Sequence, residues 1–99
     1  MSLQFEFVAP AFEWRGPAPH LFVALPVADA EVIRSFASAL TYGWGVIPVT
    51  ATVGRTTFTT SLFPRDGTYL LGLKVVVRKA EGIGIGDVIG VRLETGPVV

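Results

Sequence analysis

Apolar and polar residues alternate with a period of two along much of this 99-residue chain, and this pattern constrains its fold most strongly. Such alternation puts successive side chains on opposite faces of an extended strand, one face buried and the other solvated. In the last such segment, Ile89, Val91 and Leu93 point to one face. The pattern predicts about six strands, over residues 3–14, 20–26, 46–53, 56–63, 68–77 and 87–94.

Proline and glycine mark the turns between these segments. Pro10 interrupts the first segment, which suits a long edge strand or a bend. We expect segments 3–14 and 20–26 to pair as an antiparallel hairpin. Gly54-Arg55 suits a two-residue type II′ loop between the next two strands, and Asp66-Gly67 forms the tip of a further turn.

One segment has helical periodicity instead. Its apolar residues fall at the spacing i, i+3, i+4, i+7, namely Ile33, Phe36, Ala37 and Leu40. Asp29 is a natural N-cap before this stripe, and Gly43 is well placed to end the helix after it. We therefore expect a single helix, over 30–40, that covers one end of the core.

The segment 68–77, "TYLLGLKVVV", is apolar on both faces, which favours a central strand. A sheet of this size with so many inward positions is best closed as a barrel, since closure removes exposed edges. The length suits one domain, residues 1–99. The expected fold is mainly β, a small closed or pseudo-barrel of about six strands with one capping α-helix.

Composition limits the functional classes. The chain is 51% hydrophobic, which argues against disorder and leaves apolar surface for a partner. Eight Lys and Arg balance eight Asp and Glu, which disfavours nucleic acid as a partner and favours self-association, so a homo-oligomer is one expectation. No cysteine is present, which excludes thiolate metal sites. Without a secretory leader or an apolar run of roughly 20 residues, we expect a cytoplasmic protein with no membrane contact.

The stretch "AEGIGIGDVIGVRLE" superficially matches a nucleotide-binding glycine loop. The dinucleotide fingerprint needs Gly at relative positions one, three and six, followed by a helix. The sixth position is Asp87 counted from Gly82 and Ile89 counted from Gly84, and the residues after Asp87 alternate like a strand. We interpret Gly82, Gly84 and Gly86 as turn residues and expect no cofactor.

Two motifs carry a family resemblance, "TSLFP" at 60–64 and "VRKAEGIGIGD" at 77–87. Over most of its length the chain resembles the bacterial domain-of-unknown-function family nineteen-oh-five. The resemblance implies a double-split β-barrel, shared with AbrB- and MazE-like regulators. The family has no established activity, so the resemblance implies no catalytic residues. Gly72 departs from the pattern, which has proline before the basic run.

His20 is the only histidine, and a Ser–His–Asp site would have to use it, with Ser61 the most suggestive serine. A single histidine beside a turn is more often a surface or capping residue. No spacing typical of metal ligands is present. We therefore predict no catalytic residues and no metal site.

A basic cluster is the strongest candidate for chemistry. Lys74 lies in an otherwise apolar segment and Arg78 follows four residues later. If the strand gives way to a helical turn near Val77, both cations would converge with Ser61 and Tyr69 at one barrel end and bind an anion. In the alternative, Lys74 extends its stem over the barrel and Arg78 pairs with Glu81 or Asp87.

Four aromatic residues lie near the ends of predicted elements, namely Trp14, Tyr42, Trp44 and Phe63. Core packing is expected for each. Trp44, between two glycines, is also a candidate for a pocket rim or an interface.

These features favour a non-enzymatic binding or interaction module with a weak anion or small-ligand site. One alternative is a DNA-binding regulator, by fold analogy with AbrB-like proteins, although zero net charge disfavours it. The other is a small-molecule enzyme that uses the Lys74 and Arg78 cluster.

Overall fold

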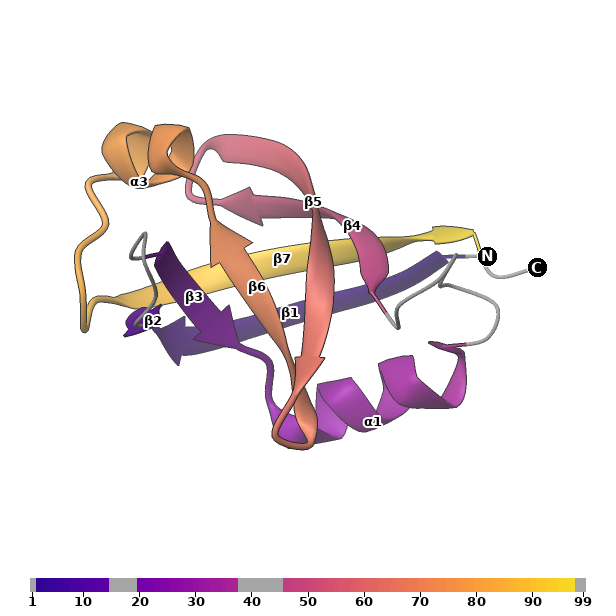
Figure 1. Cartoon of the computed structure of the whole chain (residues 1–99). Helices are drawn as coiled ribbons and strands as arrows, with labels where there is room; N and C mark the ends of the chain where they lie inside the picture. The colour runs from indigo at the N-terminus through magenta and orange to yellow at the C-terminus, as the bar shows by residue number, and fades with distance from the viewer. Residues whose placement is uncertain (1, 15–19, 38–45, 98–99) are drawn as a thin grey trace.

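A computed structural model describes residues 2–14, 20–37 and 46–97 of the chain (Figure 1). These residues form seven strands and two helices, which confirms the mainly β class. The elements are β1 (Ser2–Pro10), β2 (Phe12–Trp14), β3 (His20–Ala24), α1 (Val27–Ser35), β4 (Ile47–Val53), β5 (Thr56–Arg65), β6 (Thr68–Leu73), α3 (Val75–Glu81) and β7 (Val88–Pro97).

All seven strands belong to one sheet, in the order β1-β7-β4-β5-β6-β3-β2. Every neighbouring pair is antiparallel. The sheet curls strongly, as Figure 1 shows, so that it has a concave inner face and a convex outer face. Such curling follows from the twist that every strand carries.

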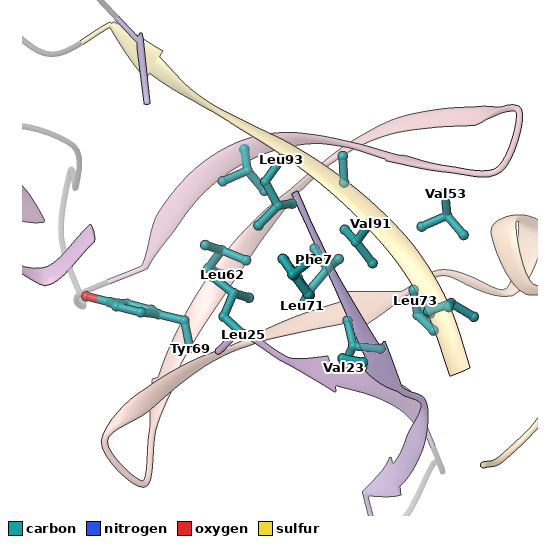
Figure 2. Packing of buried hydrophobic residues seen from close by; sticks show 14 of the residues in the cluster. Phe7, Val23, Leu25, Val53, Leu62, Tyr69, Leu71, Leu73, Val91 and Leu93 are labelled. Atoms are coloured by element: carbon teal, nitrogen blue, oxygen red, sulfur yellow. The ribbon is translucent and has the colours of Figure 1, made fainter. Parts of the chain in front are cut away.

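Alternate residues of each strand fill the concave side of the sheet. Leu62 of β5 stands opposite Leu71 of β6, which stands opposite Val23 of β3. All three are fully buried and lie in one cluster with Val91 of β7 (Figure 2). The core therefore sits inside the curl, and the residues between these positions face outward.

The first predicted strand is divided at Ala11, between β1 and β2. β1 pairs with β7, whereas β2 pairs with β3 at the other edge of the sheet. The backbone N–H of Ala11 donates to the carbonyl oxygen of Asp87 at 2.8 Å, and the carbonyl of Ala11 accepts from the N–H of Gly86 at 2.8 Å. Of the segment 3–14, only β2 pairs with β3 as the expected hairpin requires. Pro10 ends the edge strand β1 at a bend, as predicted.

The predicted closed barrel of about six strands is not found. The described residues form a curled half-barrel of seven strands whose edges are β1 and β2. These two strands follow each other along the chain through a single residue, Ala11, so they cannot lie side by side and pair. The bend instead carries the chain from one edge to the other, and β1 passes close to β3.

The two predicted tight turns are confirmed. Gly54, the first residue of the β4–β5 loop, has φ of 60°, which a type II′ turn requires at that position. Asp66 and Gly67, at the tip of the β5–β6 turn, have φ of 48° and 80°. Burial in β4 alternates as predicted, with Ile47, Val49, Ala51 and Val53 inside.

Helix α1 begins earlier than predicted. Pro26 occupies the N-cap position and its carbonyl accepts from the N–H of Ala30 at 3.0 Å. Asp29, expected as the N-cap, lies instead in the first turn, where the helix dipole still favours its charge. Proline suits this position, because its missing N–H would have no intrahelical acceptor at a helix start. The predicted end at Gly43 lies outside the described residues.

The apolar stripe of α1 is directed into the core as predicted. Ile33 is fully buried, and Phe36 and Ala37 pack against the core, whereas Leu40 lies outside the described residues. On the exposed side, a guanidinium N–H of Arg34 donates to the carbonyl oxygen of Gly67, in the β5–β6 turn, at 2.7 Å. This contact ties α1 to one end of the half-barrel.

A second helix, α3, stands where the fifth predicted strand was expected to continue. Lys74 is its N-cap residue, with extended backbone angles, and the backbone N–H of Gly82 donates to the carbonyl of Arg78. Gly82 is left-handed, with φ of 64°, which ends the helix. Val77 is buried in the core, and this docking outweighs the strand preference of consecutive valines.

The two helices lie at opposite ends of the sheet (Figure 1). The expectation of one capping helix is therefore wrong. Gly82 and Gly86 both have positive φ and the strand β7 follows them, so the glycine-rich stretch turns the chain as interpreted from the sequence.

Candidate ligand-binding site

The structure does not bring the four predicted binding residues together. Tyr69 lies on the inner face of β6 and is only 3% exposed, and Figure 2 shows it at the opposite end of the core cluster from Leu73. Ser61 lies on the outer face, because the neighbouring residue Leu62 points into the core. The Tyr69 hydroxyl is thus separated from Ser61 and Lys74 by the sheet.

Lys74 is exposed and does not lie in a strand buried on both faces. Its ammonium Nζ donates to the carbonyl oxygen of Thr59 at 2.7 Å. This carbonyl lies beyond the last pair of the β5–β6 ladder, Leu62 with Leu71. The side chain therefore satisfies a strand acceptor next to the start of α3.

Arg78 follows Lys74 by one turn of α3, and its backbone N–H donates to the Lys74 carbonyl at 2.9 Å. The guanidinium Nε is buried without a hydrogen-bond partner among the described residues. The predicted pairing with Glu81 or Asp87 is not found there. Glu81 instead accepts a hydrogen bond of 2.6 Å from the Thr56 hydroxyl.

His20 and Ser61 lie on different strands. His20 is exposed at the start of β3, and β6 separates it from Ser61 on β5. Two interstrand spacings correspond to about 10 Å between the backbones. The two side chains form no hydrogen bond within the described residues.

The outer face of β3, β6 and β5 carries a shallow depression, which we call the outer trough. It consists of two adjoining hollows of about 280 Å³ and about 330 Å³. The residues that define it are His20, Phe22, Phe63, Leu70, Gly72 and Lys74. Strand pairing builds it, because Phe22 stands opposite Gly72, and Leu70 opposite Phe63.

Gly72 forms the floor of the outer trough. A Cβ atom at this position would lie 3.4 Å from Cε1 of Phe22, so the glycine lets that ring lie close against β6. The Phe22 ring also stands 6.3 Å from the rings of Phe12 and of His20, centroid to centroid. The departure from the family pattern at Gly72 therefore coincides with a depression in the sheet.

Phe63 forms the opposite wall and is 47% exposed. The expectation that it packs in the core is therefore wrong. Its neighbour Leu62 points inward, so the alternation of β5 sends Phe63 outward. Tyr42, Trp44 and the side chain of Trp14, for which core packing was also expected, lie outside the described residues.

Basic residues stand at both ends of the outer trough. Lys74 lies at one end and Arg65 at the other. None of the described lining residues is acidic. Arg65 Nε stands 3.4 Å from Oδ2 of Asp66, whereas Lys74 forms no ion pair in the described part of the chain. The outer trough thus combines apolar walls with positive charge.

Ser61 contributes to a different hollow, on the outer face of β4 and β5. Its lining is rich in hydroxyl groups and includes Thr50 and Thr59. The same face carries a hydroxyl–hydroxyl hydrogen bond of 2.9 Å between Thr52 and Thr57. These side chains are typical of a solvated sheet face.

Two further properties concern the described residues only. They contain no group of three or more His, Asp or Glu side chains placed to hold a metal ion. None of the helices found there has the length and apolar character needed to cross a membrane.

A comparison with protein families matches residues 7–93 to the family described as Domain of unknown function (DUF1905). The chain belongs to this family. The DUF1905 match begins in β1 and ends in β7, so it includes the whole outer trough. No curated protein matches the chain.

Sequence reasoning missed the apolar residues of the outer trough in this DUF1905 chain. A signal was available, since Phe63 and Leu70 are out of phase with the core residues Leu62 and Leu71, although Leu70 is itself buried beneath the outer trough. Two apolar residues on the outward phase of neighbouring strands indicate an apolar patch on the solvent side. Their contact with β3 depends on long-range pairing, which a single sequence does not reveal.

Proposed function

We propose that this DUF1905 domain is a non-enzymatic binding module that holds a small apolar ligand in the outer trough. One observation carries the proposal: Phe63, a large ring 47% exposed, stands beside a glycine-floored depression with Phe22 on its other side. Small-molecule sites are usually concave and lined by apolar and aromatic groups with a few polar ones. The outer trough has that composition.

The rest of the outer face supports this assignment by contrast. On β4 and β5 the outward side chains include Thr50, Thr52, Thr57 and Thr59. Toward β6 and β3 this face becomes aromatic, with Phe63 and Phe22 among its described residues. Exposed apolar surface is unfavourable by about 25 cal/mol per Å² relative to burial, so a ligand that covers Phe63 gains that free energy.

The outer trough supports binding without chemistry. Its described polar lining residues are His20, Lys74, Arg65 and Thr60. A nucleophile needs a base within hydrogen-bond reach, and the suggestive serine, Ser61, lies two strands away from His20. Recognition of a ligand needs only the walls, the floor and the charges.

The proposal is tested with naphthylmethanol, a neutral two-ring probe, titrated into the protein and followed by calorimetry. We expect binding that weakens about twofold or more in Phe63→Ala, because one ring–ring contact contributes about 0.5–1.5 kcal/mol. Val88→Ala is the matched control, since Val88 is 67% exposed on the outer face of β7, away from the outer trough. Equal affinity in Phe63→Ala and parent, or no binding to the parent, contradicts the proposal.

A further inference from the structure

We propose that the ligand of the outer trough is a planar aromatic anion, with its acidic group on Nζ of Lys74 and its ring between Phe22 and Phe63. The inference rests on the proposed function and adds the charge and the orientation of the ligand. It follows from three features of the described residues: the charge of the lining, the position of the Lys74 ammonium and the spacing of Gly72 from Lys74.

The charge of the lining selects an anion. The described lining residues include Lys74, Arg65 and His20 but no carboxylate. Arg65 already faces the carboxylate of Asp66 at 3.4 Å. Lys74 has a neutral acceptor instead, the Thr59 carbonyl at 2.7 Å. The positive charge at the Lys74 end is therefore the one that a ligand carboxylate would neutralise.

The ammonium of Lys74 is directed toward β5 by its hydrogen bond to the Thr59 carbonyl. An ammonium group has three donors, so Nζ can keep its bond to Thr59 and still donate to a carboxylate. A charge-assisted hydrogen bond to a carboxylate is stronger than one between neutral groups.

The spacing of the residues orients the ring. Gly72 and Lys74 line the same hollow and are two residues apart, a rise of about 7 Å along a strand. The Phe22 ring covers Gly72, so a ligand ring would lie beside that glycine, with Phe22 on one side and Phe63 on the other. A carboxylate attached directly to that ring then points along β6 toward Lys74.

The test compares naphthoate with naphthylmethanol of the same ring attachment, by calorimetry at low and at moderate salt. We expect the parent to bind naphthoate about fivefold more tightly, the factor given by a strong exposed ion pair. Added salt should reduce this preference through screening. Lys74→Met should bind both probes equally, and Lys74→Arg should keep the preference.

Arg65→Gln is the matched control, because it removes the cation at the opposite end of the outer trough. We expect it to leave the preference unchanged. If the parent binds both probes equally, or if Arg65→Gln removes the preference and Lys74→Met does not, the inference is overturned while the proposed function stands. If neither probe binds, the proposed function itself fails. Should Lys74→Met unfold, Lys74→Arg and the salt dependence of the parent decide the question.

Discussion

The carboxylate of Glu81 occupies the space beside Gly54 in which any side chain on that glycine would have to lie. The same carboxylate accepts a hydrogen bond of 2.6 Å from the hydroxyl of Thr56 and one of 3.4 Å from the backbone N–H of Arg55. The last residue of α3 thus closes over the tip of the β4–β5 hairpin. This contact fixes a helix that the local sequence alone does not predict.

Gly54→Ala should destabilise the protein by about 2 kcal/mol. The methyl group meets Glu81, and φ of 60° is unfavourable for alanine. Gly90→Ala is the matched control, since that strand glycine has no positive φ and open space around its Cα. Urea unfolding measures both variants, and an equal loss of stability would contradict a specific role for the Glu81 contact.

Glu81→Ala should lower the free energy of unfolding by about 1 kcal/mol, because the hydroxyl of Thr56 loses its acceptor. Glu13→Ala provides a comparison, as Glu13 is an exposed glutamate of β2. We expect hydrogen exchange to rise at the β4–β5 turn and in α3 for the Glu81 variant alone. Unchanged exchange in these two segments would show that the contact does not tie them together.

Ile33→Ala should cost about 2–4 kcal/mol, since Ile33 is fully buried where α1 meets the core. The neighbouring Val32 is exposed. Val32→Ala should therefore change the melting temperature little. If the two variants have the same melting temperature, α1 is not docked through Ile33.

Val91→Pro should unfold the protein, because β7 pairs with β1 on one side and β4 on the other. Proline removes a ladder donor and its ring does not fit a central strand. Val91→Ala separates this effect from packing, and we expect it to fold with a loss of about 2 kcal/mol. Circular dichroism distinguishes the two results, and native-like melting of Val91→Pro would place β7 outside the sheet.

Alternation predicted the strands well wherever one face is buried and the other solvated. In 47–53 and 89–93 the apolar residues fall strictly on one phase, so one register satisfies burial. Alternation failed at Lys74–Val77, because the consecutive valines favour a strand locally. Burial of Val77 in the core and the left-handed conformation of Gly82 favour a helix here and outweigh that propensity.

The candidate site was harder to predict than the fold. Lys74 was identified from its apolar neighbours and lines the outer trough, but for a different physical reason, its bond to the Thr59 carbonyl. Tyr69 points into the core and Ser61 lines another hollow. Sequence proximity does not tell on which face of a curled sheet a residue lies. The contact between Phe22 and Gly72 depends on the pairing of β3 with β6, two strands that are far apart in the sequence.

The most direct test of the central claim maps the naphthoate site on the parent protein by backbone amide chemical shifts. We predict that the shifts cluster at Phe22, Phe63, Gly72 and Lys74, which meet only through the pairing of β3, β6 and β5. The amide shifts of β1 and β7, which lie beyond β4 in the strand order, should change little. Shifts that cluster on those two strands, or that stay absent at the solubility limit of the probe, would contradict a binding site in the outer trough.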